Sequence, residues 1–120
     1  MKKQVLIVED DLVLAMVNAH YLKILGYEVA GSVTSGQEAI AFVQQHCPDL
    51  ILMDVKIDGP IDGIETVVQL RAWCQAPVIY VTGNSELSIR SRAMKTGFRD
   101  FLVKPISLEM LGETLEKVFN

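Results

Sequence analysis

Three consecutive carboxylates interrupt an otherwise apolar stretch near the start of the chain. The apolar run Val5–Val8 ends abruptly in Glu9, Asp10 and Asp11, and a second apolar segment follows at once. Carboxylates within a few ångströms of one another repel, so at neutral pH they bind either protons or a cation. Mg²⁺ suits a site with few carboxylates, retained waters and a phosphoryl oxygen as a further ligand. We therefore predict a divalent cation site formed by Glu9 and Asp10, with Asp11 capping the helix that follows.

Polar residues also end three later apolar runs. The segment LILMDV reaches Asp54, VIYVTG reaches Thr82, and FLVKP reaches Lys104. A carboxylate beside Mg²⁺ can attack a phosphoryl group and become an acyl phosphate, while a lysine and a hydroxyl stabilise the transferred oxygens. Taken singly, Asp54 could be a turn residue, Thr82 a helix cap and Lys104 a surface charge. Their joint occurrence at run ends favours phosphoryl chemistry.

The apolar runs have the composition of buried parallel strands. Most are continuous and rich in Val, Ile and Leu, and longer helical patterns separate them. The runs are Val5–Val8, Tyr27–Val33, Leu50–Val55, Val78–Val81 and Phe101–Val103. The second run instead alternates and carries a charge, Glu28, which predicts a sheet edge. Successive strand–helix units predict an α/β domain with a doubly wound parallel sheet and helices on both faces. Ligands of such sheets bind at the carboxyl ends of the strands, so the residues that end the runs should meet at one rim.

Helix signals lie between the runs. Ser35 is expected to cap a helix that ends before Pro48, and Ser107 to cap the last helix of the chain. The segment Ser85–Thr96 is poor in apolar residues, so we expect it to pack loosely and to end at Gly97. A further helix has an apolar face formed by Ile64, Val67, Val68 and Ala72.

The helix expected over Leu12–Leu25 carries two apolar stripes. The first consists of Leu12, Ala15, Met16, Ala19 and Leu22, and the second of Val13, Val17 and Ile24, interrupted by His20. Either both stripes are buried, or the second is a docking face for a helical phosphodonor.

Composition narrows the class of protein. The 120 residues fit one domain, residues 1–120, and half of them are hydrophobic. A net charge of −4, the lack of a basic patch and the lack of a long apolar segment argue against nucleic-acid and membrane binding. No secretion signal precedes the first run, so a cytoplasmic protein is expected. Cys47 and Cys74 form no CxxC motif and are predicted to be reduced thiols, and His20 and His46 lack metal-ligand spacing.

The chain resembles the receiver domain of bacterial two-component response regulators. Four motifs carry the resemblance and span nearly the whole chain: LIVEDD (Leu6–Asp11), LILMDVKIDGPIDGIE (Leu50–Glu65), VIYVTG (Val78–Gly83) and DFLVKPIS (Asp100–Ser107). The resemblance implies a flavodoxin-like fold with five parallel strands in the order 2-1-3-4-5. It also implies a phosphorelay switch rather than an enzyme. Such a switch takes a phosphoryl group from a sensor histidine kinase or histidine phosphotransfer protein, with Mg²⁺-assisted self-phosphorylation and autodephosphorylation.

The resemblance further implies how the phosphoacceptor and the metal are held. Asp54 would accept the phosphoryl group as an aspartyl phosphate. Asp10 would bind Mg²⁺ directly and Glu9 mostly through water, while Asp54 and the backbone carbonyl of Lys56 would complete the protein ligands. The chain departs from the family's more frequent residues twice, with Glu9 in place of Asp and Gly83 in place of Ala.

The switch residues are implied in the same way. Thr82 would hydrogen-bond the phosphoryl group and move on activation, and Lys104 would pair with the phosphate. Phe101 occupies the aromatic switch position and is expected to turn inward on activation. The peptide before Pro105 is expected to be cis, and the face formed by Ser85–Asn120 is a candidate homodimer surface.

Two other functions compete for the loop after Asp54. The segment Asp54–Glu65 nearly fits the calcium-loop pattern D-x-[DN]-x-[DN]-G-x5-E. Against calcium, Lys56 occupies a ligand position, and the preceding segment is strand-like where an EF-hand needs a helix. A small phosphatase with Asp54 as nucleophile is the second alternative, but Lys56 stands where such enzymes place another acid.

Overall fold

Strands and helices alternate along the whole chain. The computed structural model describes residues 1–83 and 87–120. The strands are β1 (Gln4–Val8), β2 (Glu28–Val33), β3 (Leu50–Asp54), β4 (Val78–Thr82) and β5 (Asp100–Val103). The helices are α1 (Leu12–Ile24), α2 (Gly36–Gln45), α3 (Gly63–Leu70), α4 (Leu87–Met94) and α5 (Leu108–Phe119). None of these described helices is long and apolar enough to cross a bilayer.

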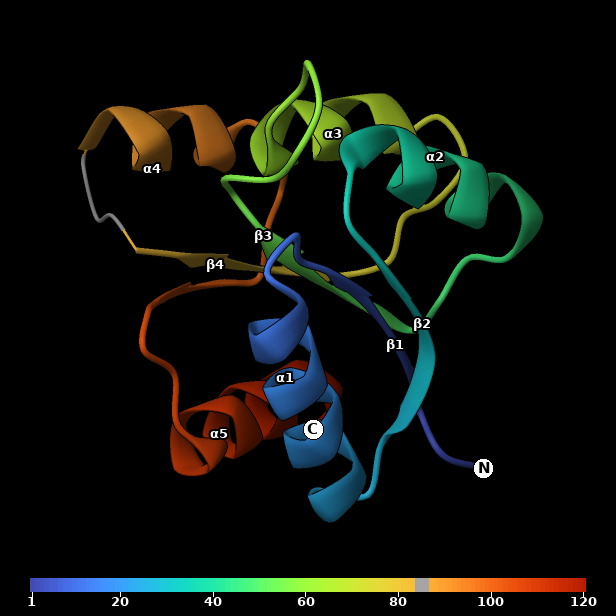
Figure 1. Ribbon diagram of the computed structural model, residues 1–120, viewed down its shortest axis with the longest axis vertical. Helices are drawn as coiled ribbons and strands as arrows, with labels where there is room; N and C mark the ends of the chain where they lie inside the picture. The colour runs from blue at the N-terminus through green and yellow to red at the C-terminus, as the bar shows by residue number, and fades with distance from the viewer. Residues whose placement is uncertain (84–86) are drawn as a thin grey trace.

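The strands form one parallel sheet in the order β2-β1-β3-β4-β5. Helices α1 and α5 cover one face, and α2, α3 and α4 cover the other (Figure 1). This confirms the predicted doubly wound sheet, its strand order and the edge position of the charged strand β2. Because β1 and β3 are central neighbours, with Val8 paired with Met53, the residues that follow Val8 lie beside the end of β3.

Each face of the sheet has its own hydrophobic core, and the period of two along the strands divides the residues between them. In β1, Val5 and Ile7 pack toward α1 and α5, whereas Leu6 and Val8 pack toward α2 and α3. All four side chains are fully buried. The central strands therefore form a rigid base for the residues at their carboxyl ends.

Polar caps fix where the helices begin. As predicted, Asp11 accepts hydrogen bonds from the backbone N–H groups of Val13 and Leu14 at 3.0 and 3.2 Å. Ser35 and Ser107 cap α2 and α5, also as predicted. Asp62 caps α3, a role that the sequence analysis did not assign to it.

The apolar stripes of α1 are only partly buried. Ala15 and Leu22 of the first stripe are buried, but Leu12 and Met16 are 66% and 72% exposed. The second stripe is exposed throughout, with its members Val13, Val17 and Ile24 at 69%, 38% and 56%. Of the two alternatives, burial of both stripes is therefore wrong, because the inward face of α1 is narrower than its apolar pattern. Similarly, α3 ends at Leu70, so Ala72 lies beyond that helix and is exposed.

The two cysteines form a disulfide, which corrects the prediction of reduced thiols. Cys47 and Cys74 are bonded, with their Cα atoms 5.5 Å apart and a sequence separation of 27. Helices α2 and α3 lie side by side on one face of the sheet (Figure 1), and each cysteine follows one of these helices. Packing of the two helices brings together residues whose sequence spacing carries no pairing signal.

Tyr80 gives the α4 side of the core a pH-dependent contribution to stability. Its fully buried hydroxyl donates to Thr96 Oγ1 at 2.9 Å, and burial raises the pKa of Tyr80 from 10.0 to about 12. Because the folded-state pKa is the higher one, the neutral phenol's contribution is complete below pH 10 and is lost as the pH rises toward 12.

We expect Tyr80→Phe to be about 1 kcal/mol less stable than the wild type at pH 8, because the hydrogen bond to Thr96 is lost. By pH 11 the wild type should lose about 1.4 kcal/mol through Tyr80 alone, so the two proteins should become similarly stable. Urea unfolding at both pH values measures the difference. A gap that stays constant between them would contradict this account.

Candidate functional site

The carboxyl ends of four strands meet at one rim of the sheet. Asp54 is the last residue of β3 and Thr82 the last of β4, while Glu9 follows β1 and Lys104 follows β5. The parallel register pairs Thr82 with Val103, the residue before Lys104. The strand pairing thus brings together residues that are up to 95 positions apart.

Lys104 bridges two buried carboxylates at this rim. Its Nζ donates to Asp54 Oδ2 at 2.9 Å and to Glu9 Oε1 at 3.0 Å. The side chains of Glu9 and Asp54 are 3% and 5% exposed, and that of Lys104 is 26% exposed. Two carboxylates share one ammonium here, so negative charge is in excess at the site.

The pKa shifts follow from this crowding. Burial raises the pKa of the Glu9 carboxyl, and neighbouring Asp54 raises it further, while Lys104 and the Asp11 backbone N–H oppose the rise. Burial lowers the pKa of Lys104, but its hydrogen bonds to Asp54 and Glu9 outweigh burial and leave it above 10.5. Lys104 is therefore an ammonium at any physiological pH.

Three carboxylates of the rim could hold a metal ion. Oxygen atoms of Glu9, Asp10 and Asp54 lie within 4.8 Å of one another. Carboxylate oxygens in small number are the ligands that Mg²⁺ prefers, with water completing its shell. The excess of negative charge beside Lys104 fits a divalent cation. Asp11, assigned to capping, is not part of this group.

Asp54 is accessible through a cavity of about 540 Å³ above the rim. The cavity is lined by the acids Glu9, Asp10, Asp11 and Asp54 together with Lys56, Thr82, Gly83 and Lys104. Every residue predicted for phosphoryl chemistry or metal binding therefore faces one space. The backbone N–H of Lys56 donates to Asp54 Oδ1 at 3.3 Å, which orients the carboxylate. Gly83 faces open space on the side where a Cβ would lie.

The switch residues Phe101 and Pro105 do not line this cavity. The peptide between Lys104 and Pro105 is cis, as predicted. Phe101 is only 7% exposed, with its ring centroid 6.1 Å from that of Tyr80 and 6.0 Å from that of Phe98. In the structure Phe101 is thus already turned inward, whereas we had expected that position only after activation. Arg90 covers the ring at 4.8 Å, and such a cation–π contact favours the inward position.

Two residues that support the site were missed by the sequence analysis. A Cβ on Gly63 would overlap the backbone carbonyl oxygen of Asp54, and the Gly63 N–H donates to Val55 at 2.7 Å. Asp62, besides capping α3, forms a 2.8 Å ion pair with Arg92 of α4. The position of Gly63 just after a helix cap was an available signal, but nothing local in the sequence pairs Asp62 with a residue of another helix.

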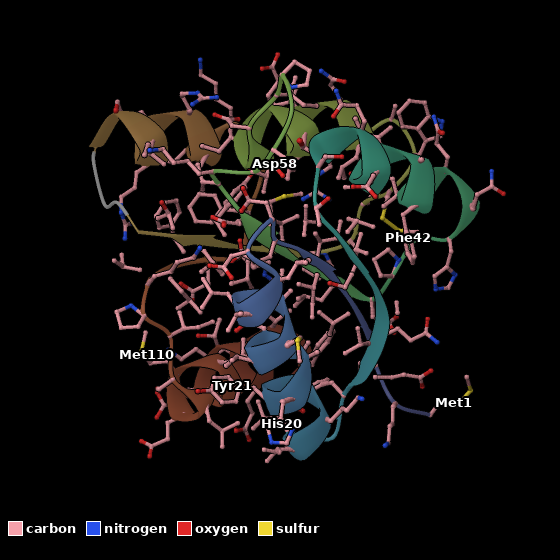
Figure 2. All side chains as sticks on the ribbon, viewed as in Figure 1. Met1, His20, Tyr21, Phe42, Asp58 and Met110 are labelled. Atoms are coloured by element: carbon pink, nitrogen blue, oxygen red, sulfur yellow. A yellow bond between two sulfur atoms is a disulfide. The ribbon has the colours of Figure 1, made fainter. Side chains whose placement is uncertain are left out.

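The loop after Asp54 lacks the features of an EF-hand. Strand β3 precedes it, as the sequence indicated, whereas an EF-hand loop starts from a helix. Asp58 lies in this loop beside the start of α2, where it pairs with Ser35 (Figure 2). Asp58 and Asp62 do not belong to the carboxylate group that the described residues form at the rim.

Neither histidine belongs to the site. His20 lies in the second half of α1, away from the start of that helix where the rim is located (Figure 2). His46 follows α2, and its Nε2 is 2.7 Å from Gln4 Oε1. This agrees with the absence of metal-ligand spacing in the sequence.

An open parallel α/β sheet with acids, a lysine and a threonine at its carboxyl rim defines a class of phosphoacceptor domains. The family model of the response regulator receiver domain matches residues 5–116. The chain therefore belongs to the response regulator receiver family, whose members are phosphoacceptor switches of two-component signalling. Among curated proteins it is similar to the chemotaxis protein CheY of Thermotoga maritima, with 32% identity over 98% of both chains.

Other relatives are longer or have solved structures. The chain is 36% identical to the transcriptional regulatory protein PdtaR of Mycobacterium tuberculosis over 95% of its own length and 55% of the regulator. It thus spans about half of that relative. The receiver domain of sensor histidine kinase PA1611 from Pseudomonas aeruginosa, solved with magnesium in its active site cleft, superposes with a TM-score of 0.85 at 29% identity. That match covers 98% of this chain and 97% of the other.

Proposed function

We propose that residues 1–120 act as one receiver domain in which Asp54 accepts the phosphoryl group. The observation that carries this assignment is the pair of hydrogen bonds from Lys104 to Asp54 and Glu9 at the mouth of the cavity. In the transfer, an Asp54 oxygen bonds to phosphorus while the bond from phosphorus to the donor's histidine nitrogen breaks, and the nitrogen keeps the electron pair. In the later dephosphorylation a water oxygen bonds to phosphorus while the bond from phosphorus to the Asp54 oxygen breaks, so that Asp54 leaves as a carboxylate and inorganic phosphate is released.

We propose Mg²⁺ as the cofactor of this site. Glu9, Asp10 and Asp54 would hold it through carboxylate oxygens, with the backbone carbonyl of Lys56 as a further ligand. Its contribution when bound is to neutralise negative charge on the transferring oxygens. The clustered acids support this choice, as does the magnesium in the related receiver.

The chain's own residues supply the rest of the chemistry. The Lys104 ammonium can move from the carboxylates to a phosphoryl oxygen without losing its charge, because its pKa lies above 10.5. The Thr82 hydroxyl lines the same cavity and can donate to a second oxygen. The phosphoryl group on Asp54 is a dianion, and its contacts with Thr82 and Lys104 would favour one of the conformations open to the loop after β4 and to the α4 face. The response would therefore be a population shift rather than a rebuilding of the fold.

Incubation with acetyl phosphate tests the assignment. With Mg²⁺ present we expect a phosphoprotein whose label maps to Asp54 by mass spectrometry, and with EDTA we expect none. Micromolar Ca²⁺ affinity that survives Asp10→Ala would instead support a calcium loop. Turnover of a generic phosphomonoester without a stable phosphoprotein would support a phosphatase.

We further propose a histidine kinase or histidine phosphotransfer protein as partner, and a cytoplasmic location. The receiver family and the exposed stripe of α1 support the partner, and similarity to CheY supports the location. The Cys47–Cys74 bond stands against this location, because disulfides are rare in reducing compartments. A homodimer through residues 85–120 stays a proposal, and Ser85, where that face begins, lies outside the described residues.

Docking on α1 predicts a selective effect of Val13→Asp. Val13 is 69% exposed, so stability should change by no more than about 0.5 kcal/mol. Phosphotransfer from the kinase should slow about tenfold, because an apolar contact is replaced by a charge. Val68→Asp on α3, where the valine is 57% exposed, is the matched control. Equal slowing by both variants would argue against docking on α1.

A further inference from the structure

The two halves of the disulfide differ in their access to solvent. Cys47, which follows α2, is an exposed residue, whereas Cys74, which follows α3, is only 2% exposed. Thiol–disulfide exchange begins when a thiolate attacks one sulfur of the bond, and access decides which sulfur is attacked. An external thiolate therefore reaches the sulfur of Cys47, and the sulfur of Cys74 is the leaving group.

The disulfide lies at the rim of the sheet opposite the phosphoacceptor. Cys47 precedes the start of β3 and Cys74 precedes the start of β4. These strands are parallel neighbours, with Ile51 paired with Val78 near their amino ends. Asp54 is at the other end of β3. A chemical change at the disulfide therefore leaves the contacts of the phosphoacceptor in place.

Arg71 connects the buried half of the disulfide to the end of α4. It lies in the α3–β4 connection, residues 71–77, and its Nη1 donates to the backbone carbonyls of Cys74 and Ala76 at 3.3 and 2.6 Å. Its Nη2 donates to the carbonyl of Thr96, which follows α4, at 3.4 Å. One guanidinium thus joins the residue that carries the disulfide to the segment behind α4, so a displacement of Cys74 reaches α4 through hydrogen bonds.

We propose that Cys47–Cys74 is a thiol–disulfide exchange site and that its substrate is a dithiol protein reductant. Reduction would release the α3–β4 connection from the end of α2 and loosen the attachment of α4. Cytosolic disulfides are usually transient, catalytic or redox-sensing, so a reducible bond agrees with the proposed cytoplasmic location and a permanent one does not. This inference goes beyond the phosphoacceptor function, because it gives the domain a second input.

The packing of the helices determines the class of reductant. Helices α2 and α3 lie side by side (Figure 1), and the Cα atoms of the two cysteines are 5.5 Å apart. After attack by a monothiol, the freed sulfur of Cys74 therefore stays close to Cys47 and re-forms the bond at a high effective concentration. A dithiol avoids this reversal, because its second thiol resolves the mixed disulfide within the same complex.

The exchange has two balanced steps. A thiolate of the reductant bonds to the sulfur of Cys47 while the bond between the two cysteines breaks, and Cys74 leaves as a thiolate that takes up a proton. The second thiolate of the reductant then bonds to the first, and Cys47 leaves as a thiolate and is protonated in turn. The cysteine pair is reduced to two thiols, and the dithiol is oxidised to a disulfide. Reoxidation by a disulfide-bonded partner reverses the same steps.

Trapping of the mixed disulfide tests the site and the direction of attack. The probe is a thioredoxin in which serine replaces the second active-site cysteine, so that the mixed disulfide is not resolved. After reaction with the oxidised wild type in the absence of denaturant, N-ethylmaleimide is added to block the freed thiol. Peptide mapping should then find the thioredoxin linked to Cys47 and the maleimide on Cys74. A link to Cys74, or a complex that forms only in denaturant, would overturn the proposal.

Reduction kinetics separate this bond from one that opens only when the protein unfolds. Without denaturant, the rate should rise in proportion to the dithiothreitol concentration and exceed the rate of global unfolding about tenfold or more. A rate equal to that of unfolding and independent of dithiothreitol would refute exchange in the folded protein. At equal thiol concentration, glutathione should reduce about tenfold less of the protein. Equal reduction by both reagents would overturn the choice of a dithiol.

The structural consequence is measured on the reduced protein. Its Tm should fall by roughly 8–16 °C, because the disulfide constrains the unfolded chain. The double variant Cys47→Ser/Cys74→Ala is the matched control, and it should melt with the reduced wild type and not respond to dithiothreitol. In NMR spectra, reduction should also shift the backbone amide of Thr96. An unchanged Thr96 amide would refute the link to α4, and an unchanged Tm would refute release of the α3–β4 connection.

Labelling by acetyl phosphate shows whether the two inputs are separate. Oxidised and reduced protein should be labelled on Asp54 at rates within about twofold of each other, because the disulfide and Asp54 lie at opposite rims. Loss of labelling on reduction would overturn this separation. An oxidised wild type that is not labelled would refute the proposed function and leave the exchange site standing.

Discussion

Replacing Asp54 by Asn is expected to abolish phosphorylation by both acetyl phosphate and the kinase. An amide is not a nucleophile toward phosphorus at neutral pH, so the label should fall below detection rather than decline partly. The protein should stay folded, because Asn has nearly the same shape and the change relieves repulsion between Asp54 and the buried Glu9 carboxylate. Mass spectrometry of the intact protein measures the label, and circular dichroism measures the fold.

Asp58→Asn is the matched control for this variant. Asp58 is an exposed aspartate of the same loop, outside the carboxylate group at the rim, so its replacement should leave labelling unchanged. In a calcium loop both aspartates would be ligands, and both variants would weaken Ca²⁺ binding. Label that persists on another residue of Asp54→Asn would disprove the assignment of the phosphoacceptor.

The sequence predicted those features that follow from strand ends. Apolar runs of five residues or so can be recognised without tertiary information, and parallel pairing then brings their last residues to one rim. For that reason the positions of Asp54, Thr82 and Lys104 were predicted, together with the caps Asp11, Ser35 and Ser107. Each of these predictions needs only the order of elements along the chain.

Features that depend on packing between helices were not predicted. The Cys47–Cys74 bond and the Asp62–Arg92 ion pair each join two helical segments, and their sequence separation carries no signal. The inward position of Phe101 is likewise set by the rings of Tyr80 and Phe98.

Replacing Lys104 by Met should have the largest effect on stability. The change removes the ammonium that both carboxylates contact. It leaves the side chains of Glu9 and Asp54 buried, at 3% and 5% exposure, without a cationic partner. Removing one partner of a buried ion pair costs roughly 3–5 kcal/mol, and we expect about 2–4 kcal/mol here because Lys104 is itself 26% exposed. Lys56→Met is the control, since Lys56 lines the same cavity but is exposed and pairs with no acid of the described residues.

The pH dependence distinguishes lost charge pairing from lost packing. The pKa of Glu9 is already raised above 4.5, and without Lys104 it should rise further, because the ammonium lowers it. A folded-state pKa above the unfolded value means that protonated Glu9 stabilises the fold, an effect complete below pH 4.5 and lost as the pH rises through the folded-state pKa. In EDTA the stability gap between Lys104→Met and the wild type should therefore narrow as the pH falls from 7 toward 4.5. A gap independent of pH would mean that Lys104 acts through its aliphatic chain, and the electrostatic account of the rim would be wrong.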